Sequence, residues 1–484
     1  RDTTIVGLGN VQDYQGPQEA LKVNQCQYVY LEDSDVSGAW DNAVDFVGVQ
    51  YGHVVRNRIH RSVSWCIYLK GGSAHFLVEG NEIFDGGEGG FAMGQGTGFE
   101  FMVSPWLHYE SYDLRFVNNV VHDIYGAGIA ANGAYDALFA FNTLYRVGQR
   151  SHAIEVLHGS RTCDGDVARC SALLAAGGWG TTRVGGDEPI PCRNVYILNN
   201  VVYNPSGYQT QWQHFTIAGP RTPSTGSNIP SPSRVDDNLL IRGNLIWNGP
   251  ADHPVGVCDP DLEARLLAEN TINTVEPQLV DPAHGDFRPV AGGSVDVATT
   301  QPLPSFPGAD LSSAPLAPAG PLANSVPLDR AGVSRGTNPP PGAYARAGSA
   351  PPSPAPGPVV TPPPPAPLPD LAGAWASLSA SRRNRVWSLS AAVRVSNLGA
   401  AAAPPTTARA YLSADGTLDS SDRLIRELSL SGYAAGETRR VSWSVRLPRG
   451  VDPRGRRVLF VLDANGSVPE SDETNDVVVS APVR

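Results

Sequence analysis

The stretch from Asn57 to Phe84, NRIHRSVSWCIYLKGGSAHFLVEGNEIF, begins and ends on the same four-residue pattern. The pattern is asparagine, any residue, an aliphatic residue, and then an aromatic residue or histidine. Four further copies and one weaker copy occur along the chain: Asn119-Val120-Val121-His122, Asn142-Thr143-Leu144-Tyr145, Asn200-Val201-Val202-Tyr203, Asn244-Leu245-Ile246-Trp247 and Ser34-Asp35-Val36. Self-similarity of this kind predicts a stack of similar structural units.

The spacing of the copies sets the size of the unit. Consecutive copies lie 23, 24, 38, 23, 58 and 44 residues apart, so three intervals match one unit and three match a unit with an insertion. A unit of this length accommodates three short strands joined by turns, and stacking places each strand about 4.8 Å from its equivalents. We therefore predict an all-β fold that begins with a right-handed parallel β-helix, in preference to a series of β-sandwich turns.

Two columns of residues support this interpretation. The asparagines are expected to stack their side-chain amides at one bend, while the aliphatic residues fill the interior. Glycines recur at 48, 72, 96, 133 and 159, with the insertions displacing 96 and 159 from the regular register. Glycine at a corner permits a positive φ or a close approach of the backbone.

Proline, concentrated between residues 302 and 369, marks a domain boundary. We expect the β-helix to span residues 1–346, with loop insertions near 97–113, 160–194 and 205–237. Residues 347–368 are expected to form a Pro-rich linker in an extended polyproline conformation. In residues 369–484, alternating apolar segments separated by turn residues predict a small antiparallel, Ig-like β-sandwich.

Charge and hydropathy exclude two classes of partner. The net charge of -11 argues against nucleic acid, because phosphate binding needs a concentrated basic surface. No apolar run reaches the roughly 18 residues that a membrane-spanning helix needs. A signal peptide is not present in this chain, and we expect that a leader has been removed.

Six cysteines occur, and none has the paired spacing of a zinc site. Four of them follow residue 160, which favours disulfide-stapled loops in an exported protein. Cys163 and Cys170 form the easiest bridge, although the sequence leaves the connectivity open. Cys26 and Cys66 occupy different points of the repeat and are not expected to pair.

Several motifs in residues 1–346 resemble those of a known family. They are Lys70-Gly71-Gly72-Ser73, Gly94-Gln95-Gly96-Thr97-Gly98, Tyr109-Glu110, Asn118-Asn119, Pro277-Gln278-Leu279-Val280-Asp281-Pro282 and Pro341-Gly342-Ala343-Tyr344. The region resembles bacterial right-handed β-helix repeat proteins, which are similar to the pectate-lyase and alginate- or chondroitin-lyase superfamily. The resemblance implies a secreted protein that handles polysaccharide.

The C-terminal region resembles a CARDB module, a bacterial adhesion-related β-sandwich. The resemblance is carried by Pro369-Asp370-Leu371, Tyr411-Leu412-Ser413-Ala414-Asp415-Gly416 and Glu470-Ser471-Asp472-Glu473-Thr474-Asn475-Asp476. Asp415, Asp419 and Asp422 are candidate ligands for Ca²⁺, the one cofactor that the sequence suggests, or belong to a solvated turn.

Lys70 is the first candidate for catalysis. Lys22 and Lys70 are the only lysines among 36 lysine and arginine residues, and Lys70 lies beside the first insertion. Lysine, unlike arginine, can be neutralised near pH 7 by its surroundings and then take a proton. In lyases of this fold a base removes the α-proton of a uronic acid while cations neutralise its carboxylate, so Lys70 is either this base or a plain turn lysine. When the coils are aligned by the repeat, Lys70 falls at the same position as Phe46, which suggests an inward-facing side chain. The alternative is that Leu69 occupies this position.

Glu110 and Arg115 follow the first insertion, as a carboxylate for a cation and a partner for a uronate, and Arg150, His152, Glu155 and His158 form a dense polar cluster. Such a group can act as general acid and base, bind a cation, or form a satisfied network at a corner of the coil. His158 is expected to align with Gln95 and Asn132, which are candidates for substrate binding.

The insertions carry aromatic and histidine side chains that suit stacking against sugar rings: Trp106, His108, Tyr109, Trp179, Trp212 and His214. The alternative is that these rings pack the loops onto the β-helix.

We therefore expect a secreted or cell-surface bacterial protein that acts on a polysaccharide, with β-elimination of a uronate polymer favoured over hydrolysis or epimerisation. The alternative is a non-catalytic extracellular protein for glycan binding, adhesion or assembly. The expected partner is a polysaccharide or a cell-surface glycan, with self-association through the ends of the β-helix as a further interaction.

Overall fold

The computed structural model describes residues 3–5, 19–249, 255–256, 260–307, 317–318, 320–345, 368–419, 422–465, 467–468, 470–472 and 475–484. The chain divides into two compact units, Arg1–Pro362 and Pro363–Arg484. The expected Pro-rich linker lies outside the described residues, except for Leu368 at its end.

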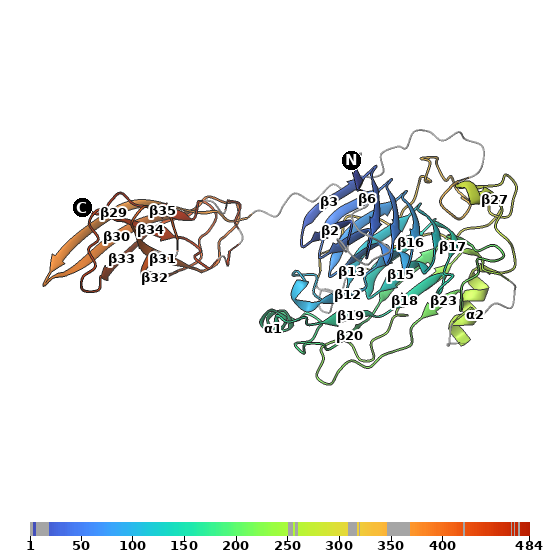
Figure 1. Cartoon of the computed structure of the whole chain (residues 1–484), viewed down its shortest axis with the longest axis horizontal. Coiled ribbons are helices and arrows are strands. Elements are labelled where there is room, and N and C mark those ends of the chain that lie inside the picture. Colours follow the sequence, from blue (N-terminus) through green and yellow to red (C-terminus); the bar gives the residue numbers. More distant parts are fainter. Residues whose placement is uncertain are drawn as a thin grey trace. The chain divides into compact units, whose positions relative to one another are not determined.

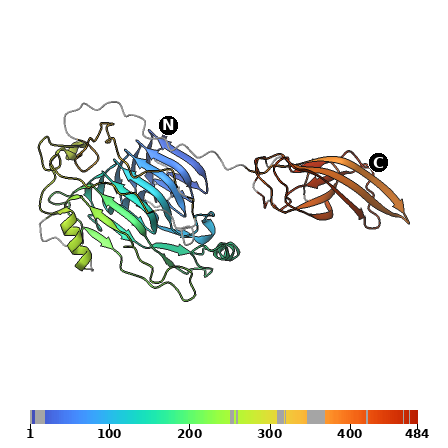
Figure 2. The same ribbon diagram turned by 180° about the vertical axis from the view of Figure 1, so that it is seen from behind.

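The first unit is a stack of coils that each contribute one strand to three long parallel sheets (Figures 1 and 2). Sheet 1 consists of β2 (Leu21–Asn24), β5 (Val44–Val47), β8 (Trp65–Lys70), β11 (Gly89–Met93), β15 (Ala127–Asn132), β18 (Ile154–Leu157) and β23 (Phe215–Ile217). Sheet 2 consists of β3 (Gln27–Glu32), β6 (Gln50–Val55), β9 (Ser73–Glu79), β13 (Ser111–Val117), β16 (Ala134–Ala140), β21 (Arg193–Leu198) and β24 (Leu240–Arg242). Sheet 3 consists of β1 (Thr4–Ile5), β4 (Asp35–Ala39), β7 (Arg58–Ser62), β10 (Glu82–Gly86), β14 (Val120–Ile124), β17 (Thr143–Val147), β22 (Val201–Tyr203), β25 (Leu245–Trp247) and β26 (Thr271–Ile272). The predicted parallel β-helix is confirmed.

The predicted asparagine ladder runs along the bend between sheets 2 and 3. The side-chain amide of Asn57 donates to Asn81 at 3.0 Å, and that of Asn81 donates to Asn119 at 2.9 Å. The same contact continues through Asn142, Asn200, Asn244 and finally Asn270. Because each Oδ1 also accepts from a backbone N–H of the preceding coil, the ladder satisfies buried polar groups within the bend.

The interior of the coils is apolar and tightly packed. Aliphatic residues of the repeat, such as Ile59, Ile83 and Val121, are buried, together with a set of phenylalanines. The rings of Phe91 and Phe116 stack with centroids 4.2 Å apart. At the C-terminal end of the stack, helix α2 (Pro260–Glu269) contributes buried leucines to this core and so covers its end.

The insertions build a small structure of their own. The first contains β12 (Gly96–Gly98) and the 3-10 helix η1 (Phe99–Phe101), and the second contains α1 (Val167–Ala175) and β20 (Glu188–Ile190). β12 pairs with β19 (Gly159–Thr162), which also pairs with β20, so the two insertions share one sheet. The range 205–237 contains β23 of sheet 1 and is therefore two loops rather than one.

After the coils, η2 (Pro282–His284) joins a short hairpin of β27 (Leu279–Asp281) and β28 (Asp286–Pro289). The second unit is an antiparallel fold with two sheets, as predicted. Its strands are β29 (Leu371–Arg383), β30 (Val386–Asn397), β31 (Thr406–Ser413), β32 (Arg423–Leu430), β33 (Thr438–Arg446), β34 (Arg457–Val461) and β35 (Val477–Val479). No helix in the described part of the chain is long and apolar enough to cross a membrane.

Candidate functional site

The outer face of sheet 1 carries a line of residues at the spacing of the coil. Lys22 pairs in register with Asp45, and Asp45 pairs with Tyr68, each one coil further along. The line continues through Ala92, Ala130 and Glu155 on β11, β15 and β18. Residues on either side of this line, such as Phe46 and Leu69, lie in the core. Because successive side chains of a strand point to opposite faces, the side chains of the line point outward.

Lys70 belongs to the next outward column. Its register partner is Val47, whereas Leu69 pairs with Phe46, so the alignment of Lys70 with Phe46 is wrong and the alternative placement of Leu69 is correct. Because successive side chains of a strand point to opposite faces, Lys70 and Tyr68 share the outer face.

A cluster of side chains surrounds Tyr68, and we call Lys22, Asp45, Tyr68, Lys70 and Gln95 the lysine–tyrosine cluster. The Lys70 ammonium lies 4.4 Å from the centroid of the Tyr68 ring and donates to Oε1 of Gln95 at 3.1 Å. Lys22 Nζ lies 2.9 Å from Oδ2 of Asp45. The cluster thus brings the two lysines of the chain close to one tyrosine and one carboxylate, and Glu19 also lies 2.6 Å from Lys22 Nζ.

Burial controls the protonation of this cluster. It raises the pKa of the Tyr68 hydroxyl, and the negative charge of Asp45 raises it further. Burial also raises the pKa of Asp45, while the charges of Lys70 and Lys22 oppose that change. The Tyr68 hydroxyl, which accepts a hydrogen bond from the Asn42 amide at 2.8 Å, therefore keeps its proton at neutral pH.

Further along sheet 1, a second polar group surrounds Glu155. Ser151 donates to Oε1 of Glu155 at 2.8 Å, and Nδ1 of His152 lies 3.8 Å from the same oxygen. The ring centroids of His152 and Trp212 lie 5.3 Å apart. Trp212 is 52% exposed, whereas the other predicted aromatic and histidine residues of the insertions are buried. Arg150, 3.2 Å from Glu88, lies at the exposed edge.

The other predicted aromatic residues are buried in the insertions. Trp106, Tyr109 and Trp179 form one cluster that packs against sheet 2. His108 bonds to the carbonyl of Gly177, and burial lowers its pKa to about 4. His214 is buried and contacts Asn273. In this structure these side chains hold the loops onto the coils, which is the alternative interpretation of the sequence.

The remaining predicted residues lie apart from the lysine–tyrosine cluster or are occupied by structural contacts. Glu110 is fully buried and pairs with Arg161 at 2.6 Å. Arg115 lies on sheet 2, where it pairs with Asp113. His158 Nε2 contacts the carbonyl of Ser233, and burial lowers the pKa of the ring. Asn132 is buried and pairs in register with Leu157 rather than with His158.

The predicted metal and disulfide residues have clear positions. Asp415 accepts from Thr417 N at 2.9 Å, and Asp422 accepts from Asp419 N at 3.2 Å. In the described ranges, the group of potential ligands that gathers within 4.8 Å is Glu100 with Cys163 and Cys170, not these aspartates. A disulfide joins Cys163 to Cys170, while Cys26 and Cys66 are free. Calcium binding at the aspartates stays a prediction.

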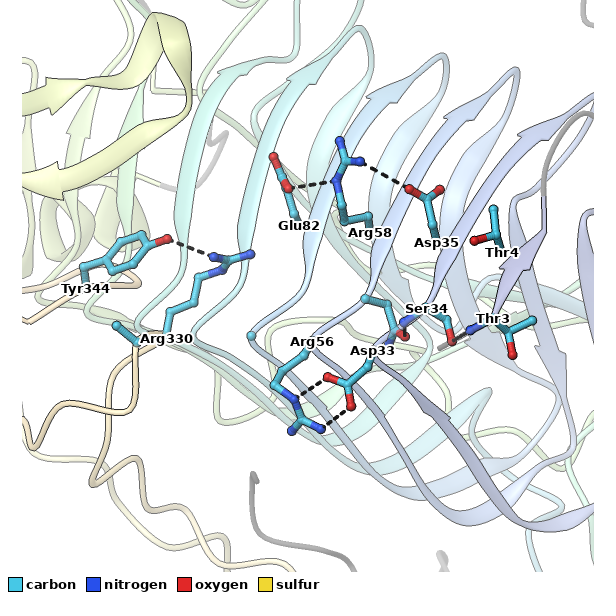
Figure 3. A pocket seen from close by; sticks show the side chains of 13 residues that line it. Thr3, Thr4, Asp33, Ser34, Asp35, Arg56, Arg58, Glu82, Arg330 and Tyr344 are labelled. Atoms are coloured by element: carbon cyan, nitrogen blue, oxygen red, sulfur yellow. Dashed lines mark hydrogen bonds and ion pairs between the residues drawn. The ribbon is translucent and has the colours of Figure 1, made fainter. Parts of the chain in front are cut away.

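A cavity of about 650 Å³ lies at the N-terminal end of sheet 3 (Figure 3). Arg56 forms two hydrogen bonds with Asp33, and Arg58 lies between Asp35 and Glu82. The charged side chains of this cavity therefore pair with one another across adjacent coils.

Sequence reasoning identified Lys70 and Gln95 but missed the rest of the lysine–tyrosine cluster. A signal was present, because Lys22, Asp45 and Tyr68 follow one another at the 23-residue period of the coil. Residues at that period lie directly above one another on one sheet.

Family comparisons agree with both units. Residues 9–166 match the family described as right handed beta helix region, and residues 369–480 match the CARDB family. The chain contains a right-handed β-helix region and a CARDB domain. The two domains together support an extracellular-type, carbohydrate-related β-helix protein. No curated protein matches the sequence.

Solved structures similar to this chain each cover about a quarter of it. The CARDB domain of a Pyrococcus furiosus protein, solved in complex with di-metal ions, is 19% identical, with 23% of this chain and 89% of that chain covered and a TM-score of 0.17. A solution structure of the same domain is 21% identical, with 23% and 91% covered and a TM-score of 0.18. A β-glucosidase from Listeria innocua in complex with glucose is 17% identical, with 23% and 15% covered and a TM-score of 0.17.

Proposed function

We propose that this protein is secreted or displayed at the cell surface and cleaves an acidic polysaccharide by β-elimination on the outer face of sheet 1. The observation that carries the proposal is the placement of Lys22 and Lys70 around Tyr68 and Asp45. The Lys22 ammonium suits a polymer of uronates, whose carboxylates must be neutralised before the neighbouring C–H bond ionises.

Each group has a role in the proposed elimination. Lys70, acting as the neutral amine, takes the proton from the carbon next to the uronate carboxylate and becomes an ammonium, and the electrons of that C–H bond form the new double bond. The bond to the glycosidic oxygen breaks, and that oxygen takes the proton of the Tyr68 hydroxyl. Lys22 pairs with a carboxylate of the polymer, and Gln95 positions Lys70 through the 3.1 Å hydrogen bond.

The second candidate function is non-catalytic glycan binding. Glu110, a predicted catalytic carboxylate, is instead held in a buried ion pair with Arg161, which favours this function. The exposed ring of Trp212 also favours it, because such a ring suits stacking on a sugar. In this case sheet 1 holds the polymer and the CARDB domain serves adhesion or assembly.

The experiment uses the full chain with a panel of uronate polymers, and follows the ultraviolet absorbance of the unsaturated product together with binding by calorimetry. Lys70→Ala is expected to lower the cleavage rate by about 10²–10⁴-fold. Arg193→Ala, which removes an exposed cation from sheet 2, is the matched control and is expected to retain the full rate.

The two functions give different results. Product from at least one polymer, lost in Lys70→Ala, supports the elimination. Binding without product on every polymer excludes cleavage and supports the glycan-binding function. Product that persists in Lys70→Ala removes Lys70 from the mechanism.

A further inference from the structure

A separate cavity of about 310 Å³ lies on the outer face of sheet 2. It is lined by side chains of β9, β13 and β16 and by described residues between Ser305 and Asn324. The side chains that matter here are His75, Asp113, Arg115 and Asp136, with Tyr112, Tyr135 and Phe306 as aromatic walls. This cavity contains no member of the lysine–tyrosine cluster.

Three of these residues share a left-handed backbone conformation. His75, Asp113 and Asp136 have φ values of 62°, 53° and 54°, in the left-handed region that L-residues seldom adopt. The pairing on either side of each residue keeps the same register, so the three lie level on successive coils as a column of left-handed kinks. The same conformation continues at Tyr51 on the coil before and at Asn194 on the coil after, so the kink is a regular feature of this face of the coil.

The hydrogen bonds of this column assign the tautomer of His75. Nδ1 of His75 lies 2.8 Å from Oδ2 of Asp113, and Arg115 lies 2.8 Å from Oδ1. Although burial alone would raise it, these two contacts lower the pKa of Asp113, so its carboxylate is ionised and accepts. Nδ1 of His75 therefore donates, so in the neutral form of the ring Nε2 holds the lone pair.

Several polar atoms around the cavity have no partner within the described ranges. They are Nε2 of His75, Nε of Arg115 and Oδ1 of Asn324. His75 and Arg115 are 1% and 4% exposed at their side chains, so water does not freely replace a partner. A buried polar atom without a partner is unfavourable, and a ligand in the cavity would supply the missing hydrogen bonds.

The balance of these groups selects the chemistry of the ligand. Among the described lining residues, Asn324 and the carboxyl oxygens of Asp113 and Asp136 offer acceptors, as does Nε2 of His75 in the neutral form of the ring, whereas Nε of Arg115 is a buried donor without a partner. Acceptors favour a ligand rich in hydroxyl groups. An anion would meet two carboxyl groups and is disfavoured.

We propose that this cavity binds one neutral sugar residue, with a hydroxyl group donating to Nε2 of His75 and a ring face against the aromatic walls. The volume lies at the lower end of the range for ligand pockets, which suits a single ring. Gly320 lies so close to the Asp113–His75 pair that a β-carbon there would overlap both, and it closes one side of the site.

Calorimetry and ligand-observed NMR on the full chain test the proposal, with a panel of neutral hexoses and the corresponding hexuronates as probes. At least one neutral hexose is expected to bind with a Kd on the order of 1 mM, and its hexuronate at least tenfold more weakly. His75→Phe, which keeps the stacking on Tyr51, is expected to weaken binding at least tenfold. His60→Phe makes the same change in the stacked ladder of sheet 3 and is expected to bind as the parent does.

His75→Gln is the second variant if His75→Phe does not fold, because it keeps a polar side chain with less bulk. Failure of every neutral hexose to bind, stronger binding of a hexuronate, or unchanged binding in the foldable His75 variant would each overturn the proposal. Lys70→Ala is expected to retain hexose binding, so this result is independent of the cleavage proposed for sheet 1.

Discussion

The Arg161 guanidinium and the Glu110 carboxylate form an ion pair of 2.6 Å in which neither side chain is exposed to solvent. The remaining polar atoms are also paired, because Glu110 accepts from Thr97 and Gly71, and Arg161 donates to the carbonyl of Trp179. The pair therefore joins both insertions to the corner of the β-helix.

Arg161→Met is expected to lower the free energy of unfolding of the β-helix by about 3–5 kcal/mol, because it leaves the Glu110 carboxylate buried without its cation. Glu110→Gln is expected to destabilise in the same direction. Chemical denaturation followed by circular dichroism measures both. A Glu110→Gln variant of unchanged stability that has lost all cleavage would contradict this structural role and make Glu110 catalytic.

Asn119→Ala is expected to destabilise the β-helix by about 2–4 kcal/mol, since it removes several buried hydrogen bonds and leaves their partners unpaired. Ser34→Ala, at the N-terminal end of the ladder, where a serine takes the place of the asparagine, is the control and is expected to cost about 1 kcal/mol or less. Equal losses in the two variants would show that the ladder does not act as a continuous element.

The fold was predictable because the ladder is local and periodic. A one-residue change of register would place polar residues in the core, so Asn57, Asn81 and their equivalents determine how every coil stacks. Asn270 also belongs to the ladder, and the sequence Asn-Thr-Ile that it begins fits the first three places of the repeat. The fourth place holds Asn273 rather than an aromatic residue or histidine, so the sequence did not reveal this last coil.

The candidate site was only partly predictable because its contacts join different coils and insertions. Glu110 looked like a catalytic carboxylate, but its partner Arg161 is 51 residues away in another insertion. His75 and Asp113 are 38 residues apart, across an insertion that hides the period. Likewise, residue type alone does not distinguish Trp179, buried in a loop, from Trp212, exposed beside sheet 1.

Tyr68→Phe separates chemistry from binding at sheet 1. The ring that carries the Lys70 contact remains, while the hydroxyl that would protonate the leaving oxygen is lost. Steady-state kinetics on the cleaved polymer are expected to show kcat reduced by about 10²–10⁴-fold with little change in KM. Tyr30→Phe, an exposed tyrosine of sheet 2, is the control. A normal kcat in Tyr68→Phe would exclude the hydroxyl as the acid.

Asp136→Asn is expected to stabilise the β-helix in a pH-dependent way. Burial raises the pKa of Asp136 to about 7, against an ordinary value of 3.8, so the folded state holds this proton more tightly than the unfolded state does. The contribution of Asp136 to stability is therefore greatest below about pH 4 and is lost as pH rises through 7. Asparagine has no charge to bury and still accepts from Asn194 through Oδ1.

The variant is expected to unfold as the parent does at pH 4 and to gain about 1–3 kcal/mol at pH 8, the range allowing for partial exposure of the carboxyl. Thermal and denaturant unfolding at both pH values measure the difference. Asp237→Asn, an exposed carboxylate paired with Arg193 on the same sheet, is the control and is expected to show no such gain. A pH-independent difference between Asp136→Asn and the parent would mean that Asp136 is ionised throughout, and that the cavity is more accessible to water than its geometry implies.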